Sequence, residues 1–277
     1  MVILLNTEAL KSIVKKDVTE VSKSTQMMIP MVGVPLVILV AIPALIIISP
    51  RVVTIPTGIN QYLYQIIDTM PQNIKLTVAS FDRIQLMIYL LVNYLFGPLF
   101  LVIPLMVSSI MAANSFAGVK EKKTIEGLLF APITDTELFL GKSLAAFIPS
   151  FLIAVIGFVL YTIVVDILAY PLFGYILLPN TLWLLLVLFL APTISFFGLA
   201  VTVIVSSKAR GFQEAQQIAG VVVLPIVAMV IMEAVGLLFL SNKIILILGT
   251  IFLALDIILI KIGIKLFKGE KILEKTK

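Results

Sequence analysis

One long uncharged stretch of this sequence covers residues 84–119, which are 36 consecutive residues without Asp, Glu, Lys or Arg. A helix of about 20 residues is enough to cross the hydrocarbon core of a bilayer. Further apolar runs follow, separated by short charged or turn-forming segments. The chain is 61% hydrophobic and 13% charged, whereas soluble domains are about 25% charged. We therefore predict an all-α membrane protein with six transmembrane helices.

The predicted spans lie within residues 24–50, 86–113, 143–165, 181–205, 215–240 and 244–266. We treat residues 24–277 as one six-helix transmembrane domain, in which residues 51–83 form an extracytoplasmic loop. Residues 1–23 read as an amphipathic interfacial helix, with a solvated tail as the alternative. Its apolar positions recur at helical spacing, at Leu10, Ile13, Val14, Val18 and Val21.

The distribution of basic residues predicts the orientation of the chain. Six spans place both termini on one side of the membrane. Of the 20 Lys and Arg residues, 16 fall on that side and four on the other. Because cytoplasmic loops carry an excess of Lys and Arg, we predict cytoplasmic termini in a multi-pass protein of the cell (plasma) membrane.

Composition also excludes several kinds of chemistry. The chain contains no cysteine and no histidine, which removes disulfides, Cys/His zinc sites and histidine-based acid–base catalysis. A carboxylate-only metal site stays open, but we assign none. The net charge of +5 comes largely from lysines that border the spans, so we expect contact with the lipid bilayer and none with nucleic acid.

A charged island, residues 115–142, joins the second and third predicted spans. Its charges are concentrated in seven residues, with Lys120, Glu121, Lys122, Lys123 and Glu126. An ionised side chain costs about 2.5–3.5 kcal/mol or more at the centre of a membrane helix, so the island must face water. We predict a cytoplasmic coupling segment over residues 114–142 that a soluble partner grips. The alternative is a solvated loop with snorkelling lysines.

Residues 136–143 read TELFLGKS, which is close to a phosphate-binding loop. Thr136 stands where that loop needs a glycine for its turn toward the phosphates. Thr134 and Glu137 instead have the spacing of a capping box that begins the third helix. We therefore predict that this chain has no nucleotide site or ATPase activity of its own.

Residues 116–132 read FAGVKEKKTIEGLLFAP and are followed by Glu137 and the pair Gly141-Lys142. This pattern resembles the cytoplasmic signature of ABC type-2 exporter permeases, the sodium-efflux-permease-like group included. Phe267 and Glu270 are similar to the closing Phe-x-x-Glu of that family. The sequence departs from the family pattern at Val119, where an acid is common, and at Lys123, where a glycine is common.

The resemblance implies a permease subunit that pairs with a second copy or a paralogue and exports substrate from the cytoplasm. It further implies separate cytosolic ATP-binding cassette proteins that bind ATP and Mg, with no cofactor held by this chain. The island would then be a coupling helix seated on the cassette. The residues implied in ATPase coupling are Lys120, Glu121, Lys122, Thr124, Glu126 and Pro132, with Lys208 and Arg210 on a second cytoplasmic turn.

Two acids, Asp256 and Glu233, fall inside predicted spans. An intramembrane carboxylate is a candidate for cation or proton passage. The alternative for Asp256 is a neutral acid or a hydrogen bond toward Lys261, and Glu233 can reach headgroup water instead. The second functional hypothesis is therefore an ion-coupled secondary transporter that uses Asp256. A membrane-embedded enzyme is not favoured, because no catalytic constellation is evident.

Overall fold

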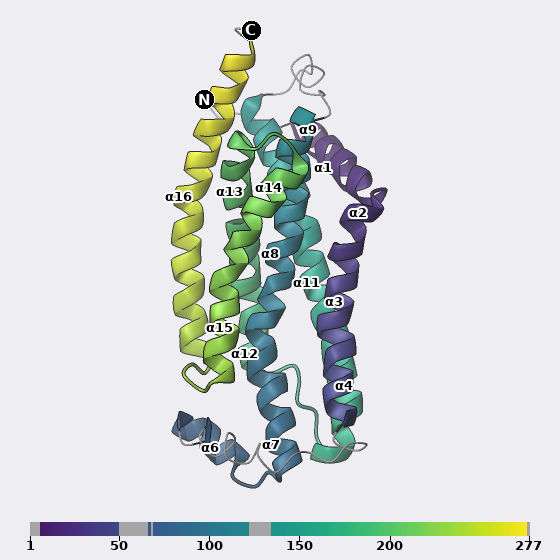
Figure 1. Cartoon of the computed structure of the whole chain (residues 1–277), viewed down its shortest axis with the longest axis vertical. Coiled ribbons are helices and arrows are strands. Elements are labelled where there is room, and N and C mark those ends of the chain that lie inside the picture. The colour runs from purple at the N-terminus through teal and green to yellow at the C-terminus, as the bar shows by residue number, and fades with distance from the viewer. Residues whose placement is uncertain (1–5, 50–65, 68, 122–133, 276–277) are drawn as a thin grey trace.

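The computed structural model describes residues 6–49, 66–67, 69–121 and 134–275. These residues form helices and connecting turns with no strand. Six helical segments are long and apolar enough to cross a membrane, and they stand side by side as one bundle (Figure 1). Their bounds are Thr25–Ile48, Arg83–Ala117, Thr136–Phe173, Thr181–Lys208, Phe212–Ala234 and Asn242–Leu266. The predicted all-α, six-span architecture is confirmed.

The bundle has two distinct ends. The helix α1 (Thr7–Ser22) and the last turns of α16 (Asn242–Lys275) lie at the same end, which we call the terminal end (Figure 1). The end of α4 (Ile42–Ile48), α6 (Gln72–Val78) and the start of α7 (Arg83–Leu90) lie at the opposite end, which we call the far end (Figure 1). Both termini therefore approach one side of the bundle, as an even number of spans requires.

Several spans are broken into α-helical segments by short π-helical turns. The first span consists of α2 (Thr25–Met28), α3 (Val34–Leu36) and α4, joined by π turns at Ile29–Gly33 and Val37–Ala41. Pro30, Pro35 and Pro43 each occupy one of the first two positions of a segment. Proline has no N–H to donate, so it removes one hydrogen bond of a regular α-helix. In a π turn the hydrogen bonds join residues five apart instead of four, and such turns let the helix continue past the prolines.

The second and fourth spans are the most buried of the six. The second comprises α7, a π turn (Leu91–Leu95), α8 (Phe96–Ala112), a π turn (Ala113–Ala117) and α9 (Gly118–Glu121). The third is one helix, α11 (Asp135–Phe173), and the fourth comprises α12 (Thr181–Leu185), a π turn (Leu186–Leu190) and α13 (Ala191–Lys208). The fifth comprises α14 (Phe212–Ala219), a 3-10 turn (Gly220–Val223) and α15 (Leu224–Ala234), and α16 is the sixth.

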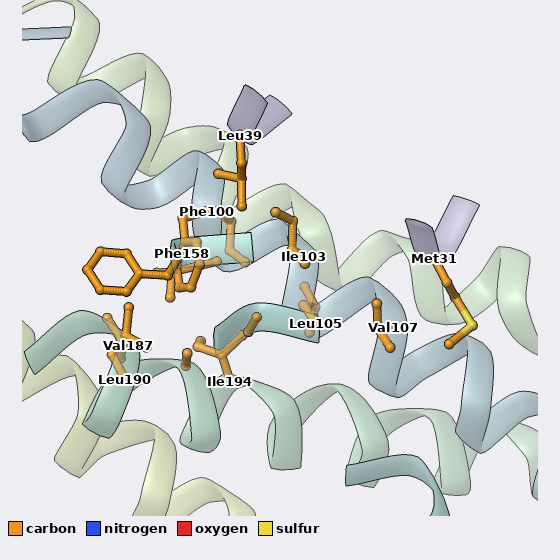
Figure 2. Packing of buried hydrophobic residues seen from close by; sticks show 14 of the residues in the cluster. Met31, Leu39, Phe100, Ile103, Leu105, Val107, Phe158, Val187, Leu190 and Ile194 are labelled. Carbon is orange, nitrogen blue, oxygen red and sulfur yellow. The ribbon is translucent and has the colours of Figure 1, made fainter. Parts of the chain in front are cut away.

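Close packing of α8, α11 and α13 makes the core (Figure 2). A Cβ atom on Gly198 would lie 2.6 Å from the Ser108 hydroxyl and 2.9 Å from the Leu105 carbonyl, so only glycine permits this approach of α13 to α8. Ser150 of α11 donates to the carbonyl of Pro104 at 2.8 Å. Small residues and inter-helix hydrogen bonds of this kind hold membrane helices together, because the surrounding lipid is as apolar as the helices.

Two predicted span ends are wrong. The third helix begins at the predicted capping box and so contains Lys142, but it continues past Asp166, where the span was expected to end. The Asp166 carboxylate accepts hydrogen bonds from the backbone N–H groups of Leu177 and Leu178. The helix ends only at Gly174, whose φ of 73° is left-handed. The fifth span ends at Ala234 rather than near residue 240, because the chain turns at Gly236 with a φ of 75°.

The predicted loop over residues 51–83 is described only in part, and α6 is its helical portion. The predicted coupling segment over residues 114–142 divides into three parts. Its first residues continue the second span to Glu121, residues 122–133 lie outside the described part, and residues 134–142 begin α11. The first helix, α1, is present, while its location at a membrane surface stays a prediction.

Candidate functional site

The structure places the described coupling candidates together at the terminal end. Glu121 is exposed at the end of α9, whose third residue is Lys120. Lys208 ends α13 and Arg210 lies in the turn before α14, and both side chains are exposed. The candidates Lys122, Thr124, Glu126 and Pro132 lie outside the described residues.

Glu121 joins the island to the second turn at this end. Its Oε2 atom accepts a hydrogen bond of 3.0 Å from the backbone N–H of Phe212, the first residue of α14. The first N–H groups of a helix lack partners inside the helix. A carboxylate at this position accepts from one of them and is also stabilised by the positive end of the helix dipole. Gly211 allows this approach, since a Cβ on it would lie 2.7 Å from the same oxygen.

Charges of both signs therefore meet at one exposed junction, which we define as Glu121, Lys208, Arg210, Gly211 and Phe212. The backbone N–H of Arg210 donates to the Glu214 carboxylate at 2.8 Å, which fixes the turn while its guanidinium extends outward. Neither Lys208 nor Arg210 forms an ion pair with another described residue. Both cations are thus available to an external acidic group.

A buried polar cluster attaches α1 to the same end. Asp17 of α1 and Lys142 of α11 are only 3% and 2% exposed. Ser115, in the π turn that follows α8, connects them: its hydroxyl donates to Asp17 Oδ2 at 2.7 Å and its carbonyl accepts from Lys142 Nζ. The Lys142 ammonium also lies 5.6 Å from the centre of the Phe116 ring, within range of a cation–π contact.

A second attachment holds the start of α1. The carboxylate of Glu137 accepts hydrogen bonds of 2.8 Å from the backbone N–H groups of Asn6 and Thr134. Thr134 and Glu137 form the predicted capping box, which is confirmed. Farther along α11, a Cβ on Gly141 would lie 3.0 Å from the Ile13 side chain, so glycine lets α1 pack closely. The Gly141-Lys142 pair of the resemblance thus serves the docking of α1.

Asp17, Ser115 and Asn6 were not among the residues predicted from the sequence. A signal was present for Asp17, because it lies four residues from both Ile13 and Val21 on the predicted apolar face of α1. An acid at such a position is costly unless it is partnered. Lys142 is the matching signal, since it is a lysine at the start of a long apolar run.

Asp256 lies within α16 and is 4% exposed. It shares a buried seam with Ile245, Gly249 and Gly263, which follow one another at helical spacing. Phe252 and Gly263 of this face contact Phe197 and Val203 of α13. The Asp256 Oδ1 atom has no hydrogen-bond partner among the described residues, and Lys261 is exposed and forms no ion pair with it. The expected hydrogen bond toward Lys261 is therefore not formed.

Glu233 has a local structural role. It lies in the last turn of α15, and its Oε1 atom accepts a hydrogen bond of 2.9 Å from the backbone N–H of Leu240. This bond closes the turn that contains Gly236. The side chain is 6% exposed, so the expectation that it extends into headgroup water is wrong.

A polar cavity of about 670 Å³ lies at the far end. Asn93 and Asn180 meet in its wall, where the Asn180 amide donates to the Asn93 Oδ1 atom at 2.7 Å. Tyr89 and Tyr94 contribute phenol rings, and the exposed Lys243 adds one positive charge. The cavity offers hydrogen-bond donors and acceptors to a polar solute.

Two alternative chemistries find little support in the described residues. Residues 136–143, the stretch that is close to a phosphate-binding loop, are continuous helix within α11. The N–H of Glu137 donates to the Thr134 hydroxyl and that of Leu138 to the Thr134 carbonyl, so the stretch is a capped helix start and not a loop. No group of three or more Asp and Glu residues is arranged to hold a metal ion in the part of the chain that the structure describes.

Comparison with models of known protein families and with curated proteins gives no match. The class of protein is therefore assigned from the architecture alone. The chain is a multi-pass membrane protein of transporter-like architecture.

Proposed function

We propose that the chain is the permease subunit of an ATP-binding cassette exporter. It pairs with a second permease subunit, and separate cytosolic ATPases supply the work of moving substrate out of the cytoplasm. The observation that carries the proposal is the exposed junction at the terminal end, where Glu121 of the island meets the turn that bears Lys208 and Arg210. This junction gives a soluble ATPase one composite surface to hold.

In this proposal, the contacts around the junction transmit a movement of the island to the transmembrane helices. A displacement of α9 is passed to α14 through the Glu121–Phe212 hydrogen bond and to α8 through the continuous π turn before α9. Ser115 in that π turn also connects α1 and α11 through Asp17 and Lys142. Movement of the island by an ATPase would therefore act on four elements together.

The far-end cavity supplies the second part of the mechanism. It lies at the far end, opposite to the junction, and presents amide, phenol and ammonium groups to a polar solute. In alternating access, one part of a transporter rocks against another, so that a bound solute is open first to one side of the membrane and then to the other. In this proposal the cavity is part of the exit path.

The test is coupled ATPase activity. The permease is reconstituted in lipid vesicles with the cassette protein encoded by a neighbouring reading frame, and phosphate release is compared with that of the cassette protein alone. We expect the permease to stimulate hydrolysis. We expect Glu126→Lys to abolish transport-coupled stimulation while the protein still inserts into the membrane, with Lys75→Glu, a charge reversal at the far end, as the matched control. Wild-type coupling in Glu126→Lys would refute the assignment.

An ion-coupled secondary transporter is the second candidate, because Asp256 is buried with an oxygen that lacks a described partner. That function predicts that vesicles containing this chain alone dissipate a proton or sodium gradient, and that Asp256→Asn stops the flux. The exporter predicts no such flux without ATP and its cassette protein. A pH-sensitive dye and radioactive sodium distinguish the two.

A further inference from the structure

A groove runs between the exposed side of α1 and the outer surface of α11. Its volume is about 630 Å³. The wall formed by α11 is apolar and includes Leu144, Ile148 and Ile153, and α1 contributes Val14 from the opposite side. Neither the coupling junction nor the far-end cavity uses these residues.

The groove has a charge at only one edge. Lys11 and Lys15 lie one helical turn apart on α1 and line it, and both are exposed. Lys11 is paired with Glu8 at 3.8 Å, but both side chains are more than three-quarters exposed, so this pair is weak. Lys15 forms no ion pair with another described residue. No acid lines the groove.

The apolar wall continues beyond this groove. Ile153 also lines a second apolar cavity, of about 200 Å³, between α11 and the first span, which reaches Leu160. From Leu144 to Ile153 the wall extends over ten residues of helix; the nine steps between them span about 14 Å at about 1.5 Å per residue. One leaflet of hydrocarbon is about 15 Å deep. The groove thus has a basic edge and an apolar trough about as long as one leaflet is thick.

We propose that this groove binds one anionic phospholipid of the leaflet at the terminal end. The phosphate-bearing headgroup lies against Lys11 and Lys15, and an acyl chain follows Leu144, Ile148 and Ile153. Basic pockets beside membrane helices select anionic headgroups in this way. The lipid fills the space between α1 and α11 and so helps to keep α1 seated. The inference is independent of the proposed exporter function, because its test measures lipid binding.

The test uses the full chain, delipidated in detergent, with phosphatidylglycerol and phosphatidylcholine of identical acyl chains as probes. Binding is measured by native mass spectrometry. The double variant Lys11→Gln/Lys15→Gln should bind phosphatidylglycerol about 30-fold more weakly, at about 1 kcal/mol for each lysine and 1.4 kcal/mol for each tenfold. Lys261→Gln/Lys265→Gln removes the same charge from exposed positions of α16 and should retain wild-type affinity.

A second variant tests the trough without changing charge. Ile148→Trp places a large ring in the groove and should weaken both lipids, whereas Leu253→Trp on the exposed side of α16 should weaken neither. Thermal unfolding of each variant verifies that it is folded. The proposal is overturned if the wild-type chain binds phosphatidylglycerol and phosphatidylcholine equally. It is also overturned if the two double lysine variants weaken binding equally, or if the two tryptophan variants weaken binding equally.

Discussion

The hydroxyl of Ser115 donates a hydrogen bond of 2.7 Å to the carboxylate of Asp17, which lies 98 residues earlier in the chain. The carbonyl of the same serine accepts from the ammonium of Lys142. One residue thus holds together the first helix, the end of the second span and the start of the third. All three side chains are buried, so an unpartnered charge in this place would be costly.

We expect Asp17 and Lys142 to be energetically coupled. Asp17→Ala should lower the free energy of unfolding by about 2 kcal/mol, because it leaves the buried Ser115 hydroxyl without its acceptor and the buried Lys142 ammonium without a nearby negative charge. Lys142→Met should have a similar effect, and the double variant should lose about 1 kcal/mol less than the sum. Unfolding in detergent micelles measures all three. Glu8→Ala, which removes the exposed ion pair with Lys11, is the control and should change stability by less than about 0.5 kcal/mol. If the losses in Asp17→Ala and Lys142→Met are strictly additive in the double variant, the two residues are not coupled and the cluster is contradicted.

The contact of α13 with α8 predicts a difference between two glycines. Gly198→Ala should destabilise the protein by about 2 kcal/mol, because the new methyl group would overlap the Ser108 hydroxyl and the Leu105 carbonyl. Gly33→Ala is the matched control in another span, with no atom within 4 Å of the added Cβ. It should be neutral or stabilise by up to about 1 kcal/mol. Thermal unfolding in one detergent compares them, and equal effects would show that the close approach is absent.

The bond between Glu121 and Phe212 predicts a local change in hydrogen exchange. Glu121→Ala removes the acceptor at the start of α14, which is worth about 1 kcal/mol. The amides at the beginning of α14 should then exchange about fivefold faster in lipid nanodiscs. Lys208→Ala removes a neighbouring charge that does not contact this amide, so exchange should stay at the wild-type rate. Unchanged exchange in Glu121→Ala would mean that the bond does not form.

The predicted orientation has a direct test, because the chain has no cysteine of its own. A single cysteine at Ser80, exposed at the far end, should react with a membrane-impermeant maleimide in intact cells. A cysteine at Glu8, exposed on α1, should react only after the membrane is permeabilised. Labelling in the opposite order would invert the topology and remove the junction from the cytoplasm.

Features that depend on local sequence were predictable. The six apolar runs give the six spans, and the Thr134–Glu137 spacing gives the start of α11. The end of the third span at Asp166 was predicted wrongly, and the burial of Lys142 was not expected, because charge was taken as a sign of exposure. A charged residue can stay inside a helix when partners from elsewhere satisfy it, as Ser115 does for Lys142. Such partners are distant in sequence and leave no local pattern.

The candidate site was predictable only in part. The resemblance implied a coupling role for Glu121, but nothing near it indicates that its partner is the backbone of Phe212, 91 residues later. Glu233 was likewise named as a candidate for ion passage from its place in an apolar run. Nothing in that run indicates that it accepts from the backbone N–H of Leu240 and so closes a turn. The groove beside Lys11 and Lys15 depends on how α1 lies on α11, which the sequence of either helix does not state.

The central claim is that the charged island is held by a separate ATPase. The most direct measurement is site-specific photocrosslinking from residue 126 in native membranes, with the same photoreactive residue at Leu76, exposed at the far end, as the control. The account predicts a product between position 126 and an ATP-binding cassette protein, identified by mass spectrometry, and none from position 76. If position 126 yields no such product while labelling shows the island on the cytoplasmic side, the account is contradicted.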